Sequence, residues 1–179
     1  MLLKRQVFER IGLFCEEFFL SYDDMELCWR ARLAGFHVGL AERSVCHHAY
    51  NFQARLEWLY FFQRNRLLTL LTLERLGTIL LIIPCLAVSE LVVGLYFIAQ
   101  GRAQTVWALL RYFLRWETWT AIAARRRILG RLRVRKDAEI VKPFAGPVMF
   151  TAVDSLAMRC LVNPVLQLYW NAVKWLIVW

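Results

Sequence analysis

Two adjacent carboxylates, Asp23 and Asp24, are the residues of this 179-residue chain best suited to chemistry. They stand where a helix is expected to begin, and the helix dipole favours negative charge in a first turn. Neighbouring acids can divide labour, because one can hold a ligand while the other accepts a proton. An acidic first turn without any catalytic role would give the same pattern, so the pair alone leaves both interpretations open.

Two other groups of residues could bind ligands. His47 and His48 follow at the end of a predicted strand, where a neutral imidazole could bind a divalent metal. They lack the i,i+4 spacing or cysteine neighbours of a strong metal motif, so a structural histidine is the alternative. Arg64 and Arg66 could hold phosphate through charge-assisted hydrogen bonds, although an arginine-rich turn at a membrane surface would have the same composition.

Local sequence patterns predict a helix that carries the acidic pair. Ser21 and Asp24 have the spacing of a capping box, in which a hydroxyl and a carboxylate satisfy two backbone donors. The helix is expected to cover residues 22–34 and to stop at Gly35, because glycine readily adopts the left-handed conformation that ends helices.

The segment after that helix has the alternation of a β-structure. Residues 36–40 and 44–48 are each predicted as a strand, and a long helix is expected from about Ala54. The first 72 residues therefore predict a mixed α/β structure.

The 24 residues from Leu76 to Ala99 are almost wholly apolar. A helix of that length reaches about 36 Å, more than the roughly 30 Å hydrocarbon core of a bilayer. Pro84 and Glu90 stand against a clean crossing, since a charge at the bilayer centre costs about 2.5 to 3.5 kcal/mol. We expect a membrane-spanning or re-entrant helix, with a buried core helix of a soluble protein as the alternative. Basic residues flank both ends, so they do not set an orientation.

The composition also points to a membrane. The chain carries 23 Lys and Arg against 14 Asp and Glu, a net charge of +9, and 59% of its residues are hydrophobic. Soluble domains are only about 45–50% apolar, so we expect contact with lipid or with a partner. Seven basic residues between Arg125 and Lys136 lie beside apolar, tryptophan-rich segments, which favours an anionic membrane surface over nucleic acid. A final helical stripe either packs on the preceding helices or contacts lipid; it comprises Val165, Leu168, Ala172, Trp175 and Trp179.

The order of these features resembles one known family. The sequence Tyr22-Asp-Asp-Met-Glu-Leu-Cys-Trp-Arg30 up to Gly35, then Val45-Cys-His-His48 and Arg64-Asn-Arg-Leu, is similar to the C-terminal half of a family-2 inverting glycosyltransferase. The most similar kind is the membrane-associated, rhamnosyltransferase-like subgroup. This resemblance implies a partial GT-A fold of the α/β class in residues 1–72. It further implies a membrane-spanning or re-entrant helix with an amphipathic basic helix in residues 73–136, and an amphipathic, interfacial tail in residues 137–179.

The resemblance also implies roles for individual residues. Asp24 would be the general base that deprotonates the acceptor hydroxyl. The acceptor would be held by Asp23, Glu26, Trp29 and Arg30. Phosphate would be bound by Arg64 and Arg66. A divalent metal, Mg or Mn, would be held on the diphosphate leaving group by His48, with His47 as the fallback.

The implied partners are a nucleotide-sugar donor, a glycan or lipid-linked acceptor, and the cytoplasmic face of the cell membrane, with no nucleic acid. The family's nucleotide-binding half has no counterpart in the sequence, so an N-terminal half or an oligomeric partner is expected to supply it. The chain alone is expected to be inactive. The alternative is a non-catalytic, membrane-anchored scaffold, for which Asp24 and His48 are dispensable and the basic run is not.

Overall fold

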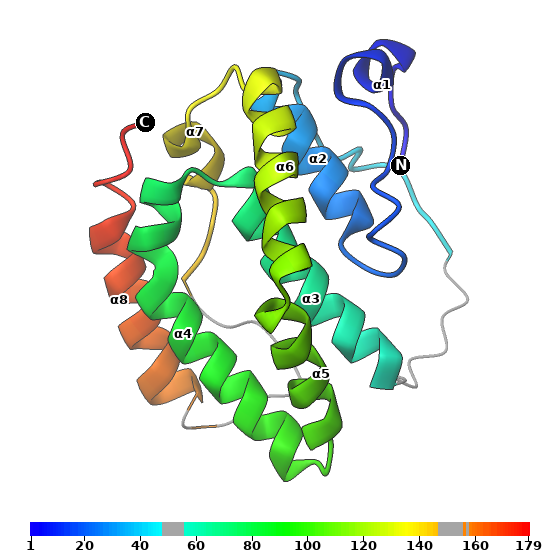
Figure 1. Cartoon of the computed structure of the whole chain (residues 1–179). Helices are drawn as coiled ribbons and strands as arrows, with labels where there is room; N and C mark the ends of the chain where they lie inside the picture. Colours follow the sequence, from blue (N-terminus) through cyan, green and yellow to red (C-terminus); the bar gives the residue numbers. More distant parts are fainter. Residues whose placement is uncertain (48–55, 147–155, 157) are drawn as a thin grey trace.

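The computed structural model of the chain describes residues 1–47, 56–146, 156 and 158–179, and these residues form a bundle of helices (Figure 1). In chain order the elements are α1 (Arg5–Ile11), α2 (Asp23–Leu33), α3 (Leu56–Leu73), α4 (Leu76–Ala99), α5 (Ala103–Leu114), α6 (Trp116–Leu132), α7 (Asp137–Val141), the π-helical turn η2 (Met158–Val162) and α8 (Asn163–Val173).

The expected α/β fold is wrong, because none of the described residues lies in a strand. Residues 36–47, which include most of the two predicted strands, form irregular chain and one turn, and residues 37–47 are exposed; residue 48 lies outside the described part. A strand is stabilised by hydrogen bonds to a neighbouring strand and by packing of one face. Among the described residues no second strand supplies either, so the alternating pattern alone does not produce a sheet.

Helix α2 confirms the helix predicted over residues 22–34 to within one residue at each end. It ends before Gly35, whose φ of 94° lies in the left-handed region. Its start differs from the prediction, since Tyr22 is the N-cap residue and no side chain caps the helix. Ser21 also has a positive φ, of 66°, so its hydroxyl does not occupy the cap position and the capping box does not form.

Helices α3 to α6 form the body of the molecule (Figure 1). α4 has the bounds predicted for the apolar segment. A turn at Gly101, with φ of 70°, sends α5 back along α4, and α6 continues to lie on α3. α8 packs along the other side of α4. As a result α3 packs on α5 and α6, whereas α4 packs on α5 and α8.

A break at Arg115 separates α5 from α6. The residue has an extended conformation with ψ of 134°, so Arg111 and Arg115 do not share one helix. The break frees backbone carbonyls at the end of α5. The side chains of Thr118 and Trp119 donate to two of them, at 2.7 and 2.8 Å.

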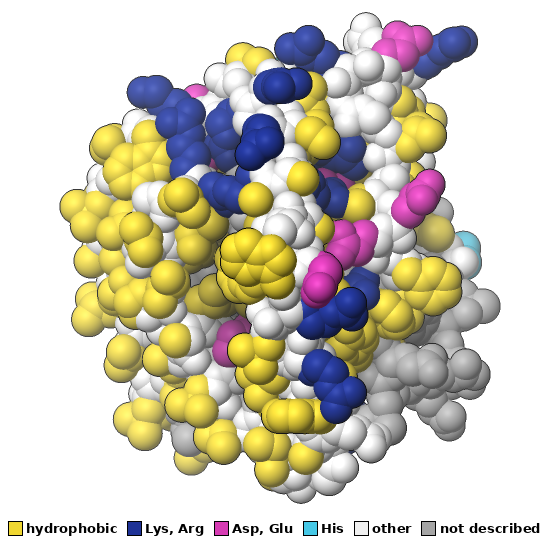
Figure 2. Space-filling model, in the orientation of Figure 1, with side chains coloured by type: hydrophobic (Ala, Val, Ile, Leu, Met, Phe, Trp, Pro, Cys, Tyr) yellow, Lys and Arg dark blue, Asp and Glu magenta, His cyan; other side chains and the backbone are white. Residues whose placement is uncertain are grey.

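The outward sides of α4 and α8 form an apolar face (Figure 2). α4 is long and apolar enough to cross a membrane, with a mean hydropathy of 2.4 over an 18-residue window of which 17% is buried. The core helix of a soluble protein would be mostly buried. The apolar face consists of the exposed residues Leu76, Leu80, Ile83, Val88, Leu91, Leu95, Ile98, Leu161, Val165, Leu168, Trp175, Leu176 and Val178.

The C-terminal stripe predicted from the sequence belongs largely to this apolar face. Val165, Leu168 and Trp175 are exposed, whereas α8 packs on the protein through Leu166 and Trp170. The sequence left open whether the stripe packs on the preceding helices or contacts lipid. These three exposed residues do not pack on the preceding helices.

Basic residues gather where α6 ends and α4 begins, on the upper part of Figure 2. Arg126 of α6 and Arg133, just after its end, both belong to the basic run and donate to the carbonyls of Leu71 and Leu73 at the end of α3. The fold therefore adds the run of residues 125–136 to the N-terminal flank of α4. This creates a charge asymmetry between the two ends of α4 that the flanking residues alone did not show.

Candidate functional site

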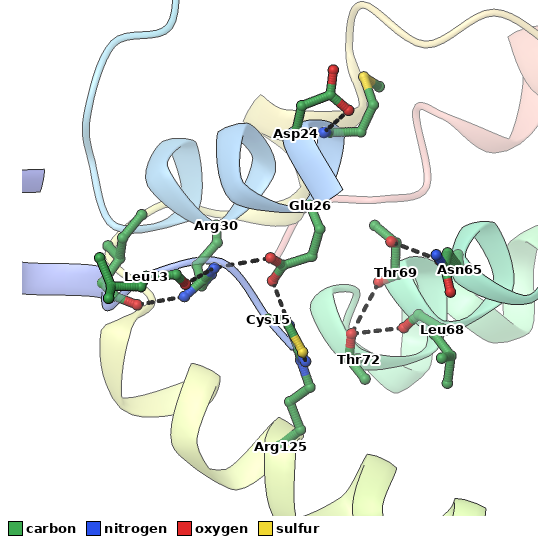
Figure 3. Close-up of polar contacts among 12 residues, drawn as sticks. Leu13, Cys15, Asp24, Glu26, Arg30, Asn65, Leu68, Thr69, Thr72 and Arg125 are labelled. Atoms are coloured by element: carbon green, nitrogen blue, oxygen red, sulfur yellow. Dashed lines mark hydrogen bonds and ion pairs between the residues drawn. The ribbon is translucent and has the colours of Figure 1, made fainter. Parts of the chain in front are cut away.

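The acidic pair begins α2. Asp24 is exposed, and its Oδ1 accepts a hydrogen bond from the backbone N–H of Met25 at 2.7 Å (Figure 3). Asp23 is half-buried. Among the described residues neither acid forms an ion pair. The carboxylate of Asp24 is thus accessible to a ligand or a proton from solvent.

The loop that precedes the acidic pair is held by α3. Asn65 is fully buried, and its Nδ2 donates to the carbonyls of Leu20, at 2.8 Å, and Ser21, at 2.7 Å. Arg64 donates to the carbonyl of Glu17, and its guanidinium lies 4.8 Å from the ring centre of Phe61. These contacts set the left-handed turn from which α2 starts. Arg64, predicted to bind phosphate, is engaged in holding this loop.

Glu26 and Arg30, predicted to hold the acceptor, lie inside the protein (Figure 3). The fully buried carboxylate of Glu26 pairs with Arg30 at 2.9 Å and with Arg125 of α6 at 2.7 Å. Arg30 also donates to the carbonyls of Ile11, at 2.6 Å, and Leu13, at 2.8 Å. This charge network joins the chain after α1 to both α2 and α6.

Arg125 is the member of the network contributed by the basic run. Burial lowers its pKa, but the carboxylate of Glu26 and the contact with Cys15 raise it, and the net shift is upward. The guanidinium lies 5.2 Å from the ring centre of Phe18. Arg125 therefore stays charged inside the fold, although the sequence placed it in a run that faces lipid.

Trp29 is the remaining residue predicted to hold the acceptor. Its ring is buried and packs edge-on against Phe144, with centroids 4.8 Å apart and planes at 75°. The contact joins α2 to the segment after α7. The structure thus gathers Glu26, Trp29 and Arg30 into the core rather than beside the exposed Asp24.

The predicted metal ligand, His48, lies outside the described residues, and its role stays a prediction. The fallback, His47, is exposed. In residues 1–47, 56–146 and 158–179 no group of three His, Cys, Asp or Glu side chains is placed to hold a metal ion.

A cavity of about 380 Å³ lies between α3, α4, α8 and the segment after α7. Pockets that bind small molecules typically measure about 300–1,000 Å³ and are mostly apolar with a few polar groups. Apolar side chains dominate this lining too. Its polar members are Tyr22, Gln63, Arg66, Glu74, Thr78, Ser89 and Tyr169.

Tyr22 connects the acidic pair with the cavity, because it lines the cavity two residues before Asp24. Its ring packs edge-on against Phe62, at 5.2 Å and 75°. Burial raises the pKa of Tyr22; the charge of Arg66 lowers it and that of Asp24 raises it, and the net shift is upward. Of the predicted site residues, the structure therefore brings Arg66 to the cavity and Asp24 to its neighbourhood.

Arg66 forms an ion pair with Glu90 of α4, and Gln63 donates to the same carboxylate at 3.4 Å. Burial lowers the pKa of Arg66, while the charge on Tyr22 raises it to a smaller extent. Polar groups in membrane helices typically face the protein interior and are paired. Glu90 follows this pattern, because the charge of Arg66 compensates its own inside the protein. The charge that stood against a membrane crossing is therefore paired.

Glu74 is the cavity residue that the sequence did not reveal. It is 1% exposed and lies beside the carboxyl of Asp137 and the indole of Trp29, but neither of its carboxyl oxygens forms a hydrogen bond of normal geometry in the described part of the protein. Burial and the nearby carboxylate of Asp137 raise its pKa to about 9. Glu74 is therefore a neutral carboxylic acid at pH 7. The only signal in the sequence was one acid at the junction of two predicted helices, which also fits an ordinary polar hinge.

Asp137, at the start of α7, supports this end of the cavity. It accepts hydrogen bonds from the hydroxyl of Thr78 and, at 2.8 Å, from the backbone N–H of Arg75, and it pairs with Arg133. Burial alone would raise its pKa, but these contacts and the carboxyl of Glu74 lower it. Asp137 is thus the ionised member and Glu74 the protonated member of a buried pair of acids.

The chain was compared with protein-family models, with curated proteins and with solved structures, and none of them matches it.

Proposed function

We propose that the chain is the acceptor-side, membrane-attached part of an inverting glycosyltransferase, with Asp24 as the general base. The observation that carries the proposal is the exposed carboxylate of Asp24 at the start of α2, on a loop held by the buried side chain of Asn65. A general base must be accessible to the substrate and held in a defined position. The resemblance of residues 22–35, 45–48 and 64–67 to family-2 glycosyltransferases, noted from the sequence, suggests the reaction class.

In this reaction the acceptor hydroxyl attacks the anomeric carbon of a nucleotide sugar. Asp24 takes the hydroxyl proton as the new carbon–oxygen bond forms, and the nucleoside diphosphate departs with the electrons of the bond that breaks. Attack from the side opposite the leaving group inverts the anomeric centre. A divalent cation, Mg²⁺ or Mn²⁺, held by His48, would neutralise charge on the departing diphosphate.

The arrangement of charge supports action at the cytoplasmic face of a cell membrane. The apolar face of α4 and α8 is the side suited to lipid, because α5 and α6 expose charged residues that include Arg111 and Glu117. Loops on the cytoplasmic side of membranes are enriched in Lys and Arg. The basic run beside the N-terminal end of α4 therefore favours that end as the cytoplasmic one, within reach of a glycan or lipid-linked acceptor.

The test is sugar transfer by membranes that contain the full chain together with a separately expressed nucleotide-binding domain of the family. Labelled dTDP-rhamnose, UDP-glucose and GDP-mannose are the donors, and incorporation into lipid and polysaccharide is measured. We expect Asp24→Asn to lower transfer by about 10²- to 10⁴-fold, the usual contribution of a general base. Glu9→Gln, an exposed carboxylate of α1, is the matched control and should leave transfer unchanged. Full transfer by Asp24→Asn would refute the role of Asp24.

A second candidate function is a non-catalytic membrane scaffold. The engagement of Glu26, Trp29 and Arg30 in core contacts favours it, because these residues would otherwise be free to bind a sugar. In that case Asp24→Asn leaves the biological effect unchanged. Charge reversal at the exposed Arg127 and Arg131 abolishes it by weakening contact with anionic lipid.

A further inference from the structure

The cavity between α3, α4 and α8 has an elongated shape that follows from helix geometry. Gln63, Arg66, Leu70 and Glu74 line it at successive turns of α3 and of the junction that follows. At 1.5 Å per residue, the stretch from residue 63 to residue 74 corresponds to a length of about 16 Å. A space that extends over this length suits an extended chain better than a compact ring.

The middle of the cavity is apolar. Leu70 of α3, Ile82 and Leu86 of α4 and Trp170 of α8 line it there. α4 and α8 are also the helices that carry the apolar face. The same two helices thus contribute both to the cavity wall and to the surface that would contact lipid. An apolar molecule dissolved in a membrane would therefore encounter the protein next to the cavity.

The charges at the cavity balance. The cation of Arg66 is paired with Glu90, and Asp137, behind Glu74, is paired with Arg133. A pKa of about 9 keeps Glu74 protonated at neutral pH. Among the described lining residues no unpaired cation remains to bind the phosphate or carboxylate group of an anionic ligand. The lining therefore suits an uncharged ligand.

Glu74 supplies the polar contact that such a ligand would need. Both of its oxygens are buried at the cavity wall, and neither forms a hydrogen bond of normal geometry in the described part of the protein, although Asp137 and Trp29 lie nearby. A buried polar group without a partner is unfavourable, and a protonated carboxyl can both donate and accept. A hydroxyl group has the same two capacities and would satisfy it.

We propose that this cavity binds an uncharged single-chain lipid, with its hydroxyl head at Glu74 and its apolar chain between α3, α4 and α8. The proposal does not rest on the proposed sugar transfer, because its argument uses neither Asp24 nor a nucleotide sugar.

The test uses the full chain in lipid nanodiscs, which avoids detergent in the cavity. The probe is a twelve-carbon alcohol that carries a photoreactive diazirine on its chain, and the labelled residues are mapped by mass spectrometry. We expect saturable labelling of the cavity-facing residues of α3, α4 and α8. Unlabelled dodecanol should compete at least tenfold better than dodecyl phosphate or dodecanoate. Labelling that does not saturate, or that falls on the outward residues of α4, would overturn the proposal, and so would equal or better competition by the two anionic compounds.

Two pairs of variants locate the ligand. Leu86→Trp fills the cavity and should abolish saturable labelling, whereas Leu91→Trp places the same ring on the apolar face of α4 and should not. Glu74→Leu removes the hydrogen bond and should weaken binding about tenfold, the equivalent of one net hydrogen bond. Glu74→Gln retains an uncharged donor and acceptor and should bind normally. The proposal fails if Glu74→Leu and Glu74→Gln bind alike, or if the two tryptophan variants do; the first comparison stands even where Leu86→Trp does not fold.

Discussion

Replacing Glu26 by Gln keeps the shape of the side chain but removes the charge that two arginines share. The Glu26 side chain is fully buried, while those of Arg30 and Arg125 are 8% and 19% exposed. The variant therefore leaves two cations in the interior without their counter-charge. We expect a large decrease in the free energy of unfolding.

The size of that decrease follows from the geometry. Removing one partner of a buried ion pair costs about 3–5 kcal/mol. Arg125 keeps some contact with solvent, and the amide oxygen of the new Gln can still accept a hydrogen bond from one arginine. We therefore expect the lower end of the range, about 3 kcal/mol.

The assay is equilibrium unfolding by guanidinium of the chain in a mild detergent, followed by tryptophan fluorescence. The matched control is Glu9→Gln, in which the lost partner is Arg5, at 3.0 Å on the exposed side of α1. Exposed i,i+4 pairs contribute little, so this variant should unfold close to the wild type. The double variant Glu26→Gln, Arg125→Gln should lose less than the sum of the two single losses, because the residues are in direct contact.

Equal unfolding midpoints for Glu26→Gln and Glu9→Gln would refute a structural role for the charge network. Unchanged stability together with lost acceptor binding would instead support the role that the sequence predicted for Glu26. The measurement thus separates a residue that holds the helices together from one that contacts a substrate.

Two further perturbations test other parts of the structure. The pKa of Glu74 is raised from 4.5 to about 9, so between these values the folded state binds a proton that the unfolded state has lost. Its contribution to stability is complete below pH 4.5 and is lost as the pH rises toward 9, with a slope of at most about 1.4 kcal/mol per pH unit. Unfolding curves at pH 5, 7 and 9 should show this decline in the wild type and not in Glu74→Gln; parallel declines would disprove the assignment. A Cβ on Gly146 would lie 2.6 Å from the carbonyl oxygen of Leu166, so Gly146→Ala should displace α8 and cost about 1–3 kcal/mol in the same unfolding assay. A Cβ on Gly130 of α6 would have no atom of another segment within 4 Å, so Gly130→Ala should instead stabilise the protein by about 0.5–1 kcal/mol. Equal effects of the two substitutions would contradict the packing described.

Helices were predictable from the sequence where local signals define them. Gly35 ends α2 because only its own backbone conformation is required, and the apolar run of α4 needs no neighbour to be helical. The strands predicted over residues 36–40 and 44–48 were wrong over the described residues 36–47, because a strand depends on a partner, which no local pattern supplies. The break at Arg115 was also missed, since the side chains that bind the freed carbonyls lie in the next helix.

The candidate site likewise contains residues whose position was predictable from local sequence and residues whose position was not. Local spacing placed Asp23 and Asp24 in the first turn of α2, as the structure shows. It did not reveal that Glu26 and Arg30, on the same helix, turn inward, because the partner Arg125 lies 99 residues from Glu26 along the chain. Glu74 had no recognisable pattern, since its pKa depends on burial by segments from several helices.

The sequence by itself determined the helical nature of α2 and α4, the placement of the acidic pair, and a composition suited to a membrane. Only the tertiary structure decided which charges are partnered, which side of α4 is exposed, where the basic run lies, and that a carboxylic acid remains neutral inside a cavity. Helix propensity and hydropathy are properties of neighbouring residues. Charge pairing and burial arise only when distant segments meet in an interior of low dielectric constant, where an unpaired charge is unfavourable.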